Sequence, residues 1–100
     1  MNSVDKYINK IHNSDCIELL NKLPDDSIDC VVIDPPYMNV VNEKWDRQWK
    51  TIDEYVEWCE EWISESKRVL KRSGSFYIFG FSYQLMKLIN NFEQNGFTFK

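Results

Sequence analysis

Four consecutive residues, Asp34, Pro35, Pro36 and Tyr37, combine groups that suit the binding of a planar amine. They follow a short apolar run, residues 30–33, which is typical of a buried strand leading into a turn. Each proline fixes φ and removes a backbone donor, and Asp34 is biased to an extended conformation because a proline follows it. The carbonyls around the prolines are therefore expected to point outward as acceptors. Together with the carboxylate they suit the N–H groups of an amine, and the tyrosine offers a face on which its ring can stack.

The residues before this turn predict a strand, a helix and a second strand. Residues 7–13 alternate loosely and predict a short strand that ends near Ser14 and Asp15, either of which can cap the next helix. Residues 16–23 place their apolar side chains on one helical stripe. After a turn, the continuous apolar run of residues 28–33 predicts a strand buried on both faces, as in a parallel sheet.

The residues after the turn predict a loop and a long helix. The loop carries Trp45 and Trp49, which we expect to anchor it on the sheet. Thr51 and Glu54 predict a capping box at the start of a helix that runs to about Lys71. Apolar residues recur along this helix at the spacing of one buried face.

The last part of the chain predicts a strand, a helix and the start of another strand. A Ser-Gly pair at residues 73–74 is expected to end the long helix before a strand over residues 75–81. Ser82 is expected to cap the final helix and Gly96 to end it before a strand begins at residues 97–100. The inward-facing residues of that helix are expected to be Leu85, Met86, Ile89 and Phe92. The order of elements predicts an α/β fold with a mostly parallel, doubly wound sheet.

The tetrapeptide at residues 34–37 resembles the catalytic motif of the amino-methyltransferases, above all the β-class DNA adenine-N6 methyltransferases, in which it comes early in the chain. The resemblance extends over roughly residues 7–99. It is strongest in residues 11–23 (IHNSDCIELLNKL), 24–37 (PDDSIDCVVIDPPY) and 68–80 (RVLKRSGSFYIFG). It implies a Rossmann-like, S-adenosyl-L-methionine-dependent methyltransferase fold, incomplete in this chain. The implied reaction moves a methyl group to N6 of an adenine flipped out of double-stranded DNA.

The resemblance also assigns roles to individual residues. Asp34 and the Pro35 carbonyl would accept hydrogen bonds from the target amine and return electron density to its nitrogen, while Tyr37, behind Pro36, would stack on the base. Catalysis would then rest on positioning and preorganised acceptors, without a covalent intermediate. Asp15, Cys16 and Asp34 are the residues expected to bind the cofactor.

Each of these residues also has an ordinary structural role that stays open. Asp34 could cap a turn, Tyr37 could pack over the end of the sheet, and Asp15 could cap a helix. His12 has no carboxylate or serine partner at motif spacing, so we expect it at the surface. A basic cluster near the end of the long helix is expected to be a solvated helix end that suits the helix dipole rather than a phosphate site. It comprises Lys67, Arg68, Lys71 and Arg72.

The glycines predict an incomplete cofactor pocket. β-class enzymes carry a Phe-x-Gly-x-Gly loop for the cofactor, whereas Gly74, Gly80 and Gly96 lack that spacing. We therefore expect residues 1–100 to be the N-terminal part of a single methyltransferase catalytic domain, without the glycine loop and target-recognition region, and inactive alone. One alternative is cytosine-N4 methylation, although cytosine enzymes more often begin the motif with Ser than with Asp34. The other is an inactive domain that acts only as a binding module.

Composition agrees with one small globular domain, since 43% of the residues are hydrophobic and 28% are charged. A formal net charge of −4 disfavours a phosphate-binding surface, so we expect DNA to be contacted mainly through regions outside this chain. Cys16, Cys30 and Cys59 are odd in number and widely spaced, which argues against a disulfide framework or zinc site and favours a cytoplasmic protein. The sequence predicts no membrane span and no metal site, and the resemblance allows a homodimer.

Overall fold

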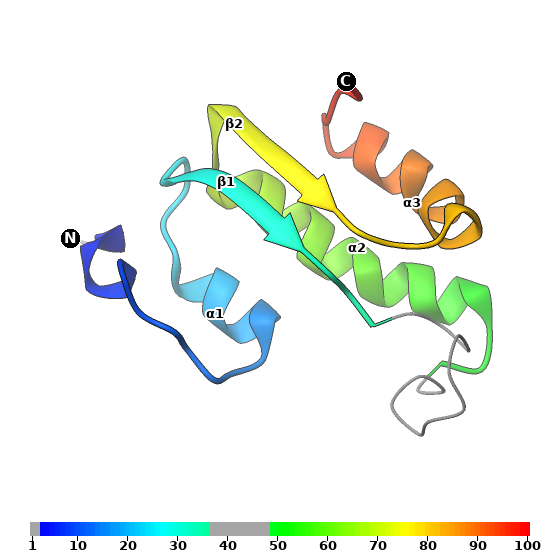
Figure 1. Cartoon of the computed structure of the whole chain (residues 1–100), viewed down its shortest axis with the longest axis horizontal. Coiled ribbons are helices and arrows are strands. Elements are labelled where there is room, and N and C mark those ends of the chain that lie inside the picture. The colour runs from blue at the N-terminus through cyan, green and yellow to red at the C-terminus, as the bar shows by residue number, and fades with distance from the viewer. Residues whose placement is uncertain (1–2, 37–48) are drawn as a thin grey trace.

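A computed structural model of the chain describes residues 3–36 and 49–100. It contains six elements (Figure 1). In chain order they are the 3-10 helix η1 (Val4–Tyr7), helix α1 (Cys16–Lys22), strand β1 (Ile28–Ile33), helix α2 (Ile52–Val69), strand β2 (Leu70–Ile78) and helix α3 (Ser82–Gln94). None of the helices in the described residues has the length and apolar character needed to span a bilayer.

Strands β1 and β2 pair in parallel, and α2 provides the crossover between them. Val31 is opposite Phe76 and Ile33 is opposite Ile78. The predicted α/β class is therefore confirmed as a small α/β unit with a two-stranded parallel sheet. The strand predicted over residues 28–33 has the predicted bounds.

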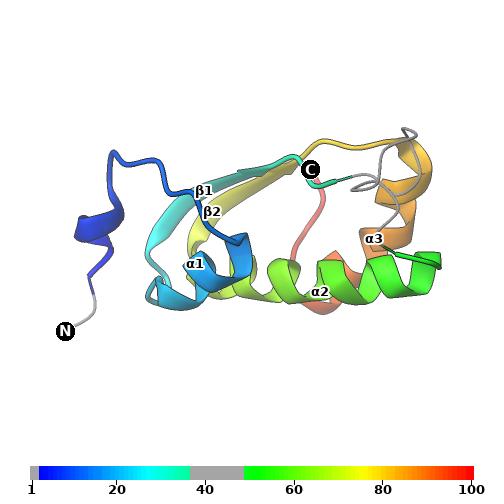
Figure 2. The same ribbon diagram turned by 90° about the horizontal axis from the view of Figure 1, so that it is seen from below.

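The three α-helices lie on the same side of this sheet (Figure 2). Ile33 and Phe76 point toward them and pack against the core, whereas Val32 and Tyr77 on the other face are 64% and 58% exposed. The prediction that β1 is buried on both faces is therefore wrong for this chain. The physical reason is that the helices of the described residues cover one face and leave the other open.

The core forms between α2, α3 and the covered face of the sheet. Its buried members are Tyr55, Cys59, Trp62, Ile63, Leu88 and Phe92. This confirms the long amphipathic helix that the apolar spacing predicted. The Trp49 ring lies 4.9 Å from the rings of both Tyr55 and Trp58, centroid to centroid. Trp49 therefore packs against α2 and not, as predicted, on the sheet. Trp45 lies outside the described residues.

The strand predicted over residues 7–13 does not form. Tyr7 ends η1, Asn9 has φ +58°, which is left-handed rather than extended, and Ile11 is fully exposed. Within the described residues no strand lies beside this segment, so no strand pairing stabilises an extended conformation here. The predicted helix α1 does form, and Asp15 occupies its N-cap position without a side-chain capping hydrogen bond.

The transition from α2 to β2 differs from the prediction. Helix α2 ends at Val69 and β2 begins at Leu70, so Gly74 lies within a strand and does not break a helix. Leu70 pairs with Ile28 and is buried, and this long-range pairing overrides the local helical pattern. Strand β2 also ends at Ile78, earlier than predicted.

The cap of α2 is confirmed at Thr51. Its Oγ1 accepts a hydrogen bond from the Glu54 N–H at 3.1 Å. The reciprocal half of the predicted capping box is displaced by one residue, because the Glu54 carboxylate accepts from the Lys50 N–H at 2.8 Å.

Helix α3 begins at Ser82, with Phe81 rather than Ser82 at the N-cap position. Phe92 is buried as predicted, but Met86 and Ile89 are 67% and 39% exposed. The buried face instead comprises Gln84, Leu88 and Phe92. The predicted inward face is displaced by about one residue toward the C-terminus, because the polar Gln84 was not expected in the core.

The chain after α3 does not form the strand predicted over residues 97–100. Gly96 has φ +90°, as expected of a residue that ends a helix. The Phe97 ring then folds back to within 5.3 Å of Phe76 and 5.4 Å of Phe92, centroid to centroid. Aromatic packing on the core thus takes the place of strand pairing.

Candidate active site

The turn at residues 34–36 lies at the carboxyl end of the sheet. Strand β1 leads directly into Asp34, and β2 leads into the neighbouring segment Phe79–Phe81. The Phe79 N–H donates to the Ile33 carbonyl at 3.0 Å, so the two segments leave the sheet side by side. Ligands of parallel α/β folds bind at this edge. The fold therefore places the Asp-Pro-Pro turn where a binding site is expected.

Burial changes sharply along the turn. Asp34 is exposed, Pro35 is buried and Pro36 is half-buried, while Tyr37 lies outside the described residues. Because the first proline is anchored in the fold, the adjacent carboxylate stays at the surface in a restrained backbone. An exposed carboxylate on a fixed turn has the acceptor capacity that an incoming amine requires.

The Pro36 carbonyl faces inward. The Tyr55 hydroxyl, on α2, donates a hydrogen bond to it at 2.9 Å. The prediction that the carbonyls around the prolines point outward is therefore wrong for Pro36. The cause is the first turn of α2, which brings a buried hydroxyl beneath the Asp-Pro-Pro turn.

A glutamine extends this contact to a third element. Gln84, on α3, donates from Nε2 to the Tyr55 hydroxyl. A Cβ on Gly80 would lie 3.0 Å from Leu85 Cδ2 and 3.4 Å from Gln84 Oε1, so the glycine leaves room for the start of α3. Sequence analysis missed Tyr55 and Gln84 as site residues. The available signal was a polar Gln84 on the apolar stripe of Leu88 and Phe92.

Asp15 and Cys16 lie on a different element from the turn, at the start of α1. Helix α1 runs opposite to β1, so its first turn lies toward the carboxyl end of the sheet (Figure 1). Both residues are exposed. Partial desolvation and the neighbouring Asp15 carboxylate raise the pKa of the Cys16 thiol, which therefore stays protonated at neutral pH and is a poor nucleophile.

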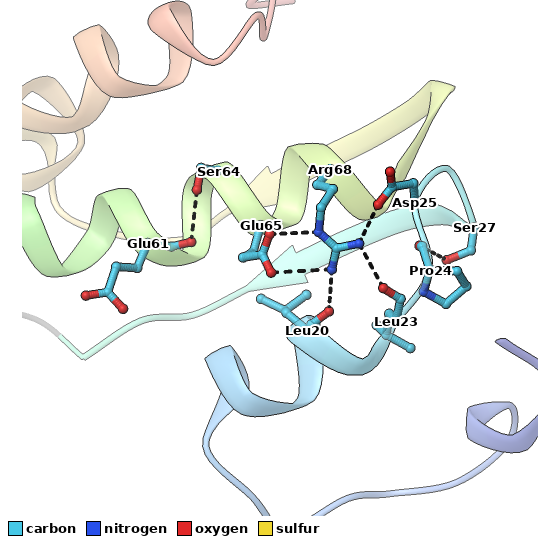
Figure 3. A network of polar contacts seen from close by, with 9 residues as sticks. All are labelled: Leu20, Leu23, Pro24, Asp25, Ser27, Glu61, Ser64, Glu65 and Arg68. Atoms are coloured by element: carbon cyan, nitrogen blue, oxygen red, sulfur yellow. Dashed lines mark hydrogen bonds and ion pairs between the residues drawn. The ribbon is translucent and has the colours of Figure 1, made fainter. Parts of the chain in front are cut away.

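Arg68 is the centre of a structural network (Figure 3). Its guanidinium donates to the carbonyls of Leu20 and Leu23 at 2.7 and 2.9 Å, and to the carboxylates of Asp25 and Glu65 at 2.6 and 2.7 Å. The prediction of a solvated helix end is therefore wrong for Arg68, whose side chain is 29% exposed. Its donors stabilise the end of α1 and are not available for a phosphate.

Two other members of the basic cluster also have partners within the chain. Lys71 forms an ion pair with Asp29 at 2.9 Å, and the Lys67 ammonium lies 5.1 Å from the centroid of the Phe97 ring. His12 is exposed, as predicted, with its ring 5.6 Å from that of Tyr7. Among residues 3–36 and 49–100, no three His, Cys, Asp or Glu side chains are grouped so as to hold a metal ion.

Comparison with known proteins identifies relatives for most of the chain. The model of the DNA methylase family matches residues 28–100, from the start of β1 onward. The type II methyltransferase M.HinfI of Haemophilus influenzae is 33% identical over 108 residues, which cover 93% of this chain and 30% of that protein. M.BglII of Bacillus subtilis is 43% identical over 72 residues, covering 72% of this chain and 19% of the relative.

A third relative, the type II methyltransferase M.BamHI of Bacillus amyloliquefaciens, is 33% identical over 75 residues, covering 72% of this chain and 17% of that protein. The chain thus spans less than a third of the length of these curated relatives. The matched region contains both strands, α2, α3 and the turn at the carboxyl end of β1. On the basis of these matches, this chain belongs to the DNA methylase family.

Proposed function

We propose that this chain supplies the target-amine half of an active site that transfers a methyl group from S-adenosyl-L-methionine to N6 of a flipped adenine in double-stranded DNA. One observation carries the proposal. An exposed Asp34 follows the carboxyl end of β1 on a turn restrained by the buried Pro35 and by the Tyr55–Pro36 hydrogen bond. Membership of the DNA methylase family supports DNA methylation, and Asp34 as the first motif residue favours adenine over cytosine.

The chemistry required of the chain is modest. The N6 amine of adenine is a weak nucleophile because its lone pair is delocalised into the ring. Hydrogen bonds accepted by the Asp34 carboxylate and the Pro35 carbonyl would hold the two N–H groups and raise the electron density on nitrogen. Tyr37 would stack on the flipped base and offset part of the stacking lost from the duplex. The nitrogen would form its bond to the methyl carbon as the bond from that carbon to the sulfonium breaks, and the methylated amine would then lose one proton to solvent.

Asp15 and Cys16 fit the cofactor's adenosine end. The Asp15 carboxylate is exposed and makes no capping hydrogen bond to α1, so it retains the acceptor capacity that an amino group requires. The cofactor would supply an electrophilic methyl group bound to a sulfonium. The residues of this chain would hold and orient the groups around it.

Three further points belong to the same proposal. Residues 1–100 form the N-terminal part of one catalytic domain, which accords with the share of the relatives that they span. DNA is then contacted mainly through other parts of the protein, in keeping with a net charge of −4. The protein acts in the cytoplasm, as a monomer or homodimer. Robust methylation of DNA by the 100-residue chain alone would contradict the domain assignment.

The test is Asp34→Ala in the complete natural protein. Loss of a preorganised acceptor is expected to lower the rate of methyl transfer by about 100-fold or more. Cofactor binding is expected to survive largely, because Asp15 and Cys16 would still hold the cofactor when the contribution of Asp34 is lost. Transfer of labelled methyl to DNA and cofactor titration by calorimetry measure the two effects. Asp29→Ala is the matched control, because Asp29 is an exposed carboxylate on β1, the strand that precedes Asp34, and is paired with Lys71.

Unchanged transfer in the Asp34→Ala variant would contradict the proposed role of the turn. Nucleoside analysis of the methylated DNA identifies the base. Recovery of N6-methyladenine supports the assignment, whereas N4-methylcytosine would retain the methyltransferase and overturn the choice of adenine.

A further inference from the structure

We propose that Tyr55 and Gln84 are positioning residues for methyl transfer, which hold the Asp-Pro-Pro turn in its working shape from beneath. The proposal rests on the proposed function of that turn. It assigns a role to two residues that are buried beneath the turn. They connect the turn after β1 to α2 and α3 through two consecutive hydrogen bonds.

The direction of the hydrogen bonds follows from the chemistry of the groups. Pro36 has no N–H, so its carbonyl, which can only accept, is the single backbone polar group by which the residue can be held. The Tyr55 hydroxyl has one proton, and it donates that proton to the carbonyl at 2.9 Å. Gln84 Nε2 donates to the same hydroxyl oxygen. The amide therefore leaves the hydroxyl proton for Pro36.

The pair is held rigidly. The Tyr55 side chain is fully buried, Gln84 is 6% exposed, and the Trp49 ring packs edge-on against the Tyr55 ring. Tyr55 also belongs to the core cluster with Cys59 and Trp62. Hydrogen bonds in such a dry environment are electrostatically stronger than the same bonds at the surface. Because Pro36 is hydrogen-bonded to this core residue, the position of the turn is restrained by the core.

Gln84 carries a cost that a purely structural residue would not need. Its Oε1 is buried and has no hydrogen-bond partner among the described residues. It lies on the stripe of Leu88 and Phe92, where an apolar side chain of similar size would fill the space without an unsatisfied oxygen. A glutamine at this place is explained by its amide donor. The hydrogen bond to the Tyr55 hydroxyl is the contribution of Gln84 that offsets this cost.

The expected benefit is preorganisation. Asp34 is two residues before Pro36, whose carbonyl is anchored. The φ angles of Pro35 and Pro36, which lie between the Asp34 carboxylate and that carbonyl, are both fixed. With Pro36 held by Tyr55, the acceptors at Asp34 and Pro35 keep their positions as the amine approaches. Misplaced acceptors slow the chemical step more than they weaken binding. Loss of the pair should therefore lower kcat and leave KM largely unchanged.

The test uses Tyr55→Phe and Gln84→Met in the complete natural protein. Tyr55→Phe removes the hydroxyl and keeps the ring. Gln84→Met removes the amide nitrogen and oxygen and keeps the length of the side chain. Each variant is expected to lower kcat roughly 10-fold, with KM for cofactor and DNA within about twofold of wild type. The double variant is expected to lose no more than the worse single variant, because the two residues act as one unit.

Stability separates positioning from a structural role. Gln84→Met is expected to unfold at the same urea concentration as wild type or a higher one, because it removes an unsatisfied buried oxygen. Ser66→Ala is the control, since Ser66 is a buried polar residue that lies on α2, as Tyr55 does, but three turns away from it. It is expected to keep wild-type kcat.

If Tyr55→Phe kept the wild-type kcat while Asp34→Ala was inactive, the positioning role of Tyr55 and Gln84 would be overturned. The proposed function of the turn would then remain in place. A Gln84→Met variant that loses activity only in proportion to lost stability would overturn the positioning role as well. Absence of methyl transfer in the wild-type protein would instead overturn the proposed function itself.

Discussion

Among the single residues, Cys59 shows how burial controls chemistry in this chain. Desolvation raises the pKa of the Cys59 thiol to about 12, and the side chain is fully buried. Cys16 and Cys30 are exposed. The buried Cys59 thiol therefore stays protonated and is inert while the chain is folded.

The raised pKa of Cys59 predicts a loss of stability at high pH. Below pH 9.0, its ordinary value, the thiol is protonated in both the folded and unfolded states, so its contribution to stability is fully present. Between pH 9.0 and about 12 the unfolded thiol ionises and the folded one does not, so that contribution is lost as pH rises. Urea unfolding at pH 8 and pH 11 should show a smaller pH-dependent loss in Cys59→Ala than in wild type. Equal losses in the two proteins would contradict the assignment.

Among the elements, the junction of α1, the following turn and α2 depends on one side chain. The Arg68 guanidinium donates to the carbonyls of Leu20 and Leu23 at the end of α1. The Leu20 carbonyl also accepts from the Leu23 N–H at 3.0 Å, so Arg68 is its second donor. The backbone adds two bonds nearby, from the Asp26 and Ser27 N–H groups to the carbonyls of Arg68 and Val69. The C-terminal ends of two helices are thereby joined across the start of β1.

We expect Arg68→Met to lower the free energy of unfolding by about 2 kcal/mol, because it removes the donor to the half-buried Leu23 carbonyl and to the Glu65 carboxylate, which is 23% exposed. Urea unfolding followed by tryptophan fluorescence measures this change. Lys71→Met is the matched control, since its ion pair with Asp29 is largely exposed and should contribute less than about 1 kcal/mol. Equal effects of the two substitutions would show that the network is no more than a surface ion pair.

Local patterns predicted the elements whose causes are local. Helix α1 and the Thr51 cap of α2 were confirmed, because helical periodicity and capping depend on residues three or four positions apart. Elements that depend on distant partners were less predictable. The strand before Asp15 did not form, and β2 began inside the predicted helix because Leu70 pairs with Ile28.

The candidate site shows the same division. The place of Asp34 after a parallel strand followed from the apolar run before it and the prolines after it. The contacts beneath the turn join residues that are 19 and 29 positions apart. Such contacts leave no periodic trace in the sequence. The polar Gln84 among apolar neighbours was the one local sign of them.

At the scale of the whole molecule, the described residues form two layers with one open sheet face. Val32, Tyr77 and Phe79 are each at least 58% exposed, and Val32 and Tyr77 are direct cross-strand partners. Contiguous apolar surface of this kind is unusual on a monomeric domain. In the 100-residue chain taken alone it is expected to bind apolar dyes.

The paired variant Val32→Thr with Tyr77→Thr should lower the fluorescence of such a dye, because it replaces apolar surface on the open face while placing a strand-favouring, β-branched residue at both positions. Met86→Thr is the control, because Met86 is 67% exposed on α3 and lies away from that face. If the control lowered the signal as much as the paired variant, the dye would not be reporting on the sheet.

The hydrogen bond between Tyr55 and Pro36 has a consequence for how sequences of this kind can diverge. It joins two residues 19 positions apart, each of which is also held by the fold outside the intervening stretch. The entropy of closing a chain between fixed ends grows only with the logarithm of its length, at about 0.6 kcal/mol for each doubling. Insertions, deletions and substitutions between Tyr37 and Trp49 should therefore accumulate at little thermodynamic cost, while the Asp-Pro-Pro turn before them keeps its position.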